Sequence, residues 1–411
     1  MARVVRSWWA AVPVIALLAV PVATAQDVPK RPALDVSGDT NSASDYFDYG
    51  MANLSKYPQR AAAAFYWASQ IDPTWAQPLY ARRVALIMGS AEPFIIGYLN
   101  GERSFTHSRH ALEIDSLELR ARMLNPFYRR DLERDLVMRY LEAEYNFISG
   151  TATAADRVTF QFYAEQYWRS SASPYMRAIL AVSNNKLQDA LRLYHDALPL
   201  LSNKGAGPEI HMARSEIFFT LGSDDSARIE MQMGLDSLRR RDAKSIVYVY
   251  ESKGVFEHAI GLIYERQGLP DQAREAYTRA LQEDLGYYPA HLRLGLLALA
   301  VGDSATALNE LELAAQIKED EPWVQTTYGA VLVELGHLDE AGRHLHRATE
   351  LAPFYAAPYY ALGRVAELAN RPDDAVHLYE SYLARARIGE PRADEVRGRL
   401  AALKGTTGPR E

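Results

Sequence analysis

The stretch LVELGHLDEAGRHLHRATELAP, Leu332 to Pro353, contains two sets of residues that support different interpretations. Its three histidines lie within ten residues and suggest a metal site: His337, His344 and His346. Its small residues are spaced as in a helix–turn–helix unit: Gly336, Ala341 and Ala348. The small residues decide the fold, because they recur elsewhere in the chain.

The recurrence has a constant step of 34 residues. Five positions keep this step through four consecutive units, which is the period of a helical hairpin repeat. The columns are Gly261, Gly295, Gly329 and Gly363; Gly268, Gly302, Gly336 and Asn370; Ala273, Ala307, Ala341 and Ala375; Tyr277, Leu311, Leu345 and Tyr379; and Ala280, Ala314, Ala348 and Tyr382.

Each column has a physical role in a helical hairpin. Gly268 and its equivalents fall at the turn, where a left-handed backbone is accessible without a side chain and Asn370 is the usual substitute. Gly261 and its equivalents lie within the first helix and let the two helices approach closely. The alanines fit crowded crossings of the second helix, and a larger residue between them, such as Tyr277, packs against the next unit.

These residues resemble the tetratricopeptide repeat, whose consensus is matched by Gly261, Tyr264, Gly268, Ala273, Tyr277, Ala280 and Pro353. The resemblance is strong from about Gly254 to Arg387. It extends upstream to Ala178–Ala197, more loosely to Gly222–Gly234, and to a second helix around Ala61–Pro73. It implies an all-α fold: a right-handed superhelical solenoid of antiparallel helix hairpins.

The chain divides by sequence into eight segments. We expect a signal peptide (1–25), a flexible leader (26–44), N-terminal repeat-like helices (45–90) and divergent helical hairpins (91–173), for which a separate domain is the alternative. Degenerate repeats (174–250) with a lengthened connection at 237–250, four regular repeats (251–388), a capping helix (389–404) and a tail (405–411) follow.

The N-terminus has the pattern of an export signal. Arg3 and Arg6 precede an apolar run too short to span a bilayer comfortably, and Ala23-Thr24-Ala25 provides a small-residue cleavage site. An uncleaved anchor is the alternative. We expect a periplasmic or secreted protein, stabilised by packing without disulfides since the chain has no cysteine. The net charge of −7 argues against nucleic acid as a partner.

No arrangement of residues carries catalysis, so we expect no enzyme, cofactor or metal. His344 and His346 are two residues apart on one helix and point in different directions, so we interpret them as solvated. His107, His110 and Glu113 share a helical face and are the better metal candidate, but a partly exposed polar face is the favoured explanation. Phosphate-loop and nucleophile-elbow motifs are absent from the sequence.

The resemblance implies a binding surface lined by the first helix of each unit. The family's groove positions correspond here to His258, Leu262, Glu265, Arg266, Arg293, Leu296, Leu299, Trp323, Thr326, Thr327, Glu334, Tyr360, Arg364 and Glu367. The carboxylate clamp of chaperone-binding members is not reproduced, because His258, Leu262 and Arg293 replace its Lys/Asn cluster. For Trp323, packing between units is as good an explanation as partner contact.

These observations favour a non-catalytic scaffold or adaptor of the cell envelope that binds a protein or peptide partner and could form homo-oligomers. One alternative is a module that binds a glycan through the aromatic-rich region from Phe94 to Trp168. The other is an enzyme built on Glu92–Ser173.

Overall fold

The computed structural model describes residues 29–34, 38–89, 111–128, 150–151, 174–201, 207–242 and 253–406. Within these ranges all regular secondary structure is α-helical, which confirms the predicted fold class. The chain divides into two compact units, Met1–Lys30 and Arg31–Glu411, and the second contains every described helix. The predicted signal peptide, His107, His110 and most of the aromatic-rich region lie outside the described residues.

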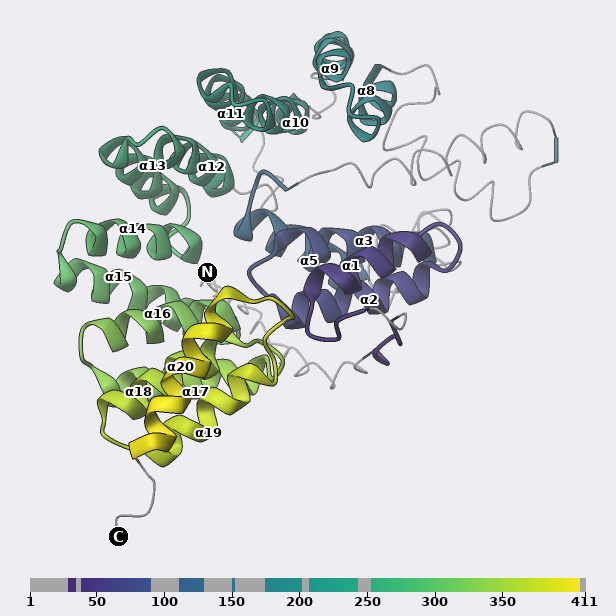
Figure 1. Cartoon of the computed structure of the whole chain (residues 1–411). Coiled ribbons are helices and arrows are strands. Elements are labelled where there is room, and N and C mark those ends of the chain that lie inside the picture. Colours follow the sequence, from purple (N-terminus) through teal and green to yellow (C-terminus); the bar gives the residue numbers. More distant parts are fainter. Residues whose placement is uncertain are drawn as a thin grey trace, which may run out of the picture. The chain divides into compact units, whose positions relative to one another are not determined.

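The described helices form successive antiparallel hairpins, each packed against its neighbours along the chain (Figure 1). None of them is long and apolar enough to cross a membrane. Their bounds are α1 Ala43–Asn53, α2 Pro58–Ile71, α3 Ala76–Gly89, α5 Ala111–Leu124, α8 Pro174–Ser183, α9 Leu187–Leu201, α10 Gly207–Thr220, α11 Asp224–Asp242, α12 Lys253–Arg266, α13 Pro270–Glu283, α14 Tyr288–Ala300, α15 Ser304–Ile317, α16 Pro322–Glu334, α17 Leu338–Leu351, α18 Ala357–Leu368, α19 Pro372–Leu383 and α20 Pro391–Thr406.

The hairpin turns have the left-handed backbone predicted for their glycine column. Gly268 has φ = +72°, and Asn370 adopts φ = 54° in its place. The turn closes with two bonds: the Gly268 N–H donates to the Glu265 carbonyl at 2.9 Å, and the Leu269 N–H donates to the Tyr264 carbonyl at 2.9 Å. This pair of bonds satisfies carbonyls that a helix end would otherwise leave unpaired.

The same two-bond turn joins five other hairpins, including the two upstream ones that fit the repeat less closely. In α8–α9 it is built on Asn185, with φ = 56°, and in α10–α11 on Gly222, with φ = +73°. The degenerate units therefore keep the backbone geometry of the regular ones even where their side chains differ.

The glycines within the first helices mark close helix approach, as predicted. A Cβ added to Gly261 would lie 2.3 Å from Cε1 of Tyr277, and one added to Gly329 would lie 2.6 Å from Cγ of Leu345. Both opposing side chains are fully buried. The large residue of the second helix therefore packs directly on the backbone of the first, within the same unit, whereas the sequence pattern predicted that it packs against the next unit.

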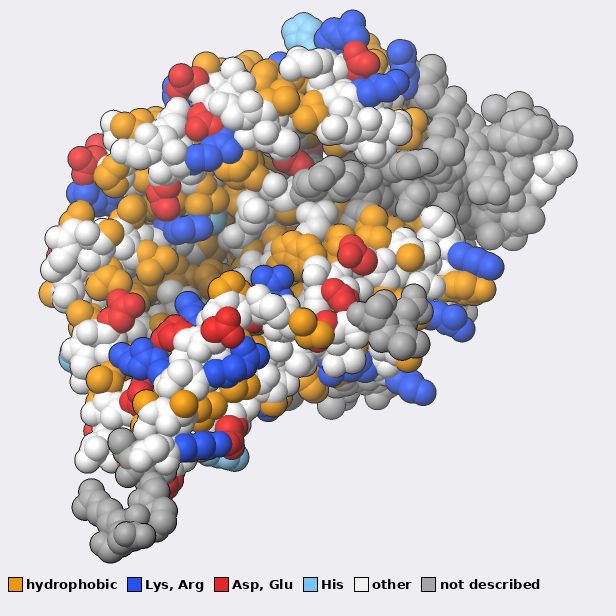
Figure 2. Space-filling view, viewed as in Figure 1, with side chains coloured by type: hydrophobic (Ala, Val, Ile, Leu, Met, Phe, Trp, Pro, Cys, Tyr) orange, Lys and Arg blue, Asp and Glu red, His pale blue; other side chains and the backbone are white. Residues whose placement is uncertain are grey.

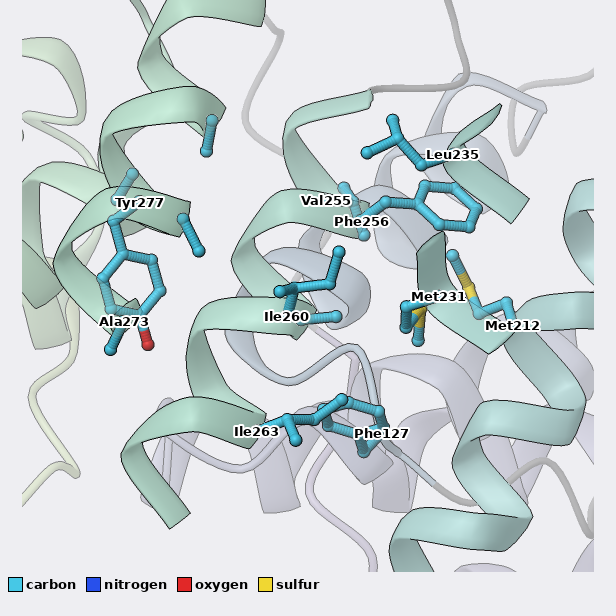
Figure 3. Packing of buried hydrophobic residues seen from close by; sticks show 14 of the residues in the cluster. Phe127, Met212, Met231, Leu235, Val255, Phe256, Ile260, Ile263, Ala273 and Tyr277 are labelled. Carbon is cyan, nitrogen blue, oxygen red and sulfur yellow. The ribbon is translucent and has the colours of Figure 1, made fainter. Parts of the chain in front are cut away.

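The core consists of hydrophobic clusters that each span several helices. Figure 3 shows part of the cluster around α10–α13, where Phe256 lies beside Leu235, and Met212 beside Met231. Burying each such side chain contributes roughly 1.5–3 kcal/mol. Because the clusters cross hairpin boundaries, each unit depends on its neighbours for stability.

Three segments differ from the sequence-based expectation. α11 continues to Asp242, so the first part of the expected lengthened connection is helical, and Leu238 is buried there. α20 ends at Thr406, two residues beyond the range 389–404 predicted for the capping helix, and buries Val396.

The third difference is in the expected flexible leader. Arg31 lies 5.1, 4.9 and 5.1 Å from the ring centroids of Tyr46, Trp67 and Phe354, and its Nε donates to the Tyr46 hydroxyl at 2.8 Å. Asn41 Nδ2 donates to the Ala384 carbonyl at 3.0 Å. These contacts join residues far apart in the sequence, and composition alone gives no sign of them.

Candidate partner-binding surface

The predicted groove residues lie on the first helices α12, α14, α16 and α18. Two of them are buried and offer nothing to a partner. His258 is 2% exposed, and its Nδ1 is 3.1 Å from the Tyr287 hydroxyl. Thr326 is 7% exposed, and its hydroxyl donates to the Pro322 carbonyl at 2.7 Å. Burial, with a further effect of the Arg293 charge, lowers the pKa of His258 to about 3, so this histidine is neutral.

Arg266 joins neighbouring units. Its Nη1 donates to the Phe219 carbonyl at 2.8 Å, its guanidinium lies 3.2 Å from the Phe219 ring centroid, and Nη2 pairs with Asp224. These contacts fix α12 to the end of α10 and the start of α11.

Glu265 is also engaged within the repeats, by a hydrogen bond and an ion pair. Its Oε1 accepts the Tyr277 hydroxyl at 2.5 Å, and its Oε2 is 3.5 Å from Nη1 of Arg293. The carboxylate thus holds Tyr277 of its own unit and reaches α14, the first helix of the next unit.

The groove positions of the fourth unit face α20. The Tyr360 hydroxyl donates to Glu395 at 2.9 Å. Glu367 Oε2 accepts from Arg399 Nη1 at 3.0 Å and from the Tyr379 hydroxyl at 2.5 Å, and lies 3.3 Å from Nη1 of Arg364. The capping helix therefore takes the place that a partner would occupy on this unit.

Trp323 has mainly a packing role. It lies against the hydrophobic cluster shared by α14, α16 and α18, with its ring centroid 6.1 Å from that of Tyr288. Its indole N–H is buried and has no hydrogen-bond acceptor among the described residues. The structure therefore favours the packing interpretation of this residue.

Among the predicted positions that are exposed or partly exposed, several lie on α14 and α16, while Arg266 on α12 is exposed but contacts α10 and α11. Leu296 is 36% exposed, Leu299 and Thr327 are partly exposed, and Glu334 is exposed. We call these four residues the α14–α16 patch, and Arg293, also partly exposed, lies one turn before Leu296. In Figure 2, hydrophobic side chains gather in a hollow beside α12, α14 and α16. Leu262 is partly buried on α12 and packs against that helix's cluster.

Sequence reasoning missed a second feature of this surface, which is that α5 packs on the repeats. Nη2 of Arg120 is 2.9 Å from Oε1 of Glu321. The Phe127 ring, just past the end of α5, stacks on Phe219 with centroids 3.9 Å apart and planes 2° apart. Phe127 also lies beside Ile263 (Figure 3). The repeat columns could not reveal this contact, because α5 lies outside them.

A polar pair between the two helices of a hairpin was also missed. His211 Nδ1 is 2.8 Å from Glu230 Oε2, and His291 Nδ1 is 2.7 Å from Glu310 Oε2. His344 Nδ1 is 2.7 Å from Gln325 Oε1. The two members are 19 residues apart in each pair, and this common spacing in the sequence could have identified them.

The third of these pairs corrects the expectation for His344. This side chain is half-buried against Tyr328, with ring centroids 4.6 Å apart, whereas His337 and His346 are exposed. Burial lowers the pKa of His344. Within the described ranges, no group of three His, Asp or Glu side chains could hold a metal ion. Glu113, the described member of the other metal candidate, pairs with Arg82.

Comparison with known proteins identifies relatives for the C-terminal part of the chain. The tetratricopeptide repeat family model matches residues 258–322 and 329–405. A TPR repeat-containing protein of Pseudomonas aeruginosa is 36% identical over 138 residues, which are 34% of this chain and 55% of that relative. The chain thus matches about half the length of this curated relative.

Two solved structures illustrate the structural likeness. YrrB, described as a TPR protein with an unusual peptide-binding site, is 16% identical with a TM-score of 0.37, over 50% of this chain and 96% of that one. Yeast Tom70 is 13% identical with a TM-score of 0.45, over 89% of each chain.

Proposed function

Residues 258–322 and 329–405 of this chain match the tetratricopeptide repeat family model, and on this premise we propose that the protein is a non-catalytic scaffold that binds a protein or peptide partner through the α14–α16 patch. The observation that carries the proposal is Leu296, an apolar side chain that stays 36% exposed on a first helix, one turn after Leu292, which is 2% exposed. In many interfaces a few residues at the buried centre supply most of the binding energy.

The surroundings of Leu296 define the chemistry of the partner. Arg293 precedes it on α14, and Glu334 is exposed at the end of α16. A peptide with an apolar anchor and charges of both signs would fit this arrangement, because charge complementarity fixes orientation around a hydrophobic contact. A polyacidic ligand would be repelled by Glu334, and a polybasic ligand would be repelled by Arg293.

The proposed setting is the cell envelope. Its support is the N-terminal pattern of basic residues, a short apolar run and Ala23-Thr24-Ala25, and the absence of cysteine is compatible with an oxidising compartment. N-terminal sequencing of the protein recovered from an envelope extract tests it. A mature chain beginning at Gln26 supports export, and a chain that keeps residues 1–25 in the cytosol overturns it.

A photo-crosslinking amino acid at Leu296 tests the binding surface. The matched control is Leu285, an apolar side chain that is 80% exposed in the connection between α13 and α14. We expect adducts with a defined protein at position 296 and none at position 285. With the photo-crosslinker placed at another residue of the α14–α16 patch, Leu296→Glu should abolish the adduct without changing the unfolding midpoint. Equal adducts at 296 and 285 would overturn the proposal.

A further inference from the structure

The segment that includes α5 has two faces with different partners. Leu117, Ala121 and Tyr128 are buried in the cluster formed with α2, α3 and α8. Arg120 and Phe127 instead contact residues of the repeats. Met123, which lies between them, packs against the two clusters of the repeat helices.

The repeat-facing residues have the spacing of a helix bound in a groove. Arg120, Met123 and Phe127 are at positions i, i+3 and i+7, the pattern by which amphipathic helices insert anchors into hydrophobic grooves. Phe127 is buried although it lies beyond the last turn of the helix.

The repeats supply complementary groups for Arg120 and Phe127. The Glu321 side chain is 3% exposed and lies 2.9 Å from Arg120. A buried carboxylate left without a cation is strongly destabilising, so this site selects a positive charge. Phe219 offers a flat aromatic face to Phe127. Arg122 adds two bonds to Glu209, of 3.1 and 3.0 Å.

We propose that this surface, formed by α10, α12 and the start of α16, is a receptor for short amphipathic helices that present a cation at i and large apolar residues at i+3 and i+7. The α5 segment fills it in cis, and a partner helix of the same chemistry replaces α5. The inference rests on the proposed protein-binding function and names the chemistry of the partner. Cis occupancy gives α5 a high effective concentration, so an external helix binds weakly until α5 is displaced.

A labelled synthetic peptide of residues 111–128 serves as the probe, in a fluorescence anisotropy titration of the full chain. We expect weak binding to the wild-type chain. Arg120→Ala combined with Phe127→Ala in the chain should tighten peptide binding at least about tenfold, because the cis competitor is weakened. Adding Glu321→Gln should reverse that gain, and a peptide with the same two alanines should bind neither chain.

Circular dichroism verifies that each variant is folded, and Phe127→Ala alone, which keeps the Arg120–Glu321 ion pair, is the milder substitute if the double variant unfolds. The inference is overturned if the peptide binds the wild-type chain and the Arg120→Ala/Phe127→Ala chain with equal affinity, or if it does not bind the folded Arg120→Ala/Phe127→Ala chain. Crosslinking at Leu296 separates this outcome from failure of the proposed function. A retained Leu296 adduct without peptide binding overturns only the helix chemistry, and peptide binding without the adduct overturns only the proposed patch.

Discussion

Substitution of Gly261 by alanine tests the close helix approach that defines each unit. The new Cβ would lie 2.3 Å from Cε1 and 2.7 Å from Cδ1 and Cζ of Tyr277, whereas ordinary contacts are 3.4 Å or longer. The ring must therefore move by about 1 Å, in a site where Tyr277 is fully buried and bonded to Glu265. Overpacking of this kind costs about 1–3 kcal/mol, and the better helix propensity of alanine returns about 0.5–1 kcal/mol.

From the middle of both ranges, the net expectation is a loss of about 1 kcal/mol in the free energy of unfolding. Gly342→Ala is the matched control, because Gly342 also lies within a helix, α17, and no atom lies within 4 Å of its added Cβ. This variant should be stabilised by up to about 1 kcal/mol. Urea unfolding followed by far-ultraviolet circular dichroism measures both. If Gly261→Ala is stabilised as much as Gly342→Ala, Tyr277 does not pack on the α12 backbone as described.

Three further substitutions test other parts of the structure. His344→Ala should cost about 0.5–1.5 kcal/mol in urea unfolding because Gln325 loses its partner, while exposed His346→Ala should change little. Burial lowers the pKa of His258 from 6.5 to about 3. The contribution of neutral His258 to the free energy of unfolding is therefore fully present above pH 6.5 and is lost as the pH falls toward 3. His258→Gln should flatten this dependence in acid titrations followed by circular dichroism. Val396→Asp places a charge at a fully buried site of the cap and should lower the unfolding midpoint by more than any surface change.

The architecture could be predicted because each structural requirement leaves a mark at one residue. A left-handed turn selects glycine or asparagine, and Gly268, Asn370 and Asn185 all have positive φ. The docking of Arg31 leaves no such mark. It depends on Phe354, which is more than 300 residues away in the sequence. The sequence of a polar segment does not show whether a single arginine in it packs among aromatic rings or is solvated.

The binding surface was less predictable, because a groove position is exposed only if nothing else in the chain packs on it. Leu296 and Tyr360 are both assigned to the groove by the repeat. Leu296 stays accessible, while Tyr360 bonds to Glu395 of α20. The family pattern specifies where a helix faces inward. It does not specify the helices outside the repeat, and here α20 and α5 cover part of the inward face.

The polar pairs explain why the histidines of the Leu332–Pro353 stretch were misleading. His291 has a carboxylate partner, Glu310; burial lowers its pKa, but the hydrogen bonds to Glu310 and to the Leu285 carbonyl outweigh that effect, and the pKa is raised. His344 has a neutral amide partner, Gln325, and its pKa is lowered by burial. Moreover, the histidine is on the first helix in one pair and on the second in the other. A position that accepts histidine on either helix, with either a charged or a neutral partner, requires a hydrogen bond across the hairpin and not a charge or a metal.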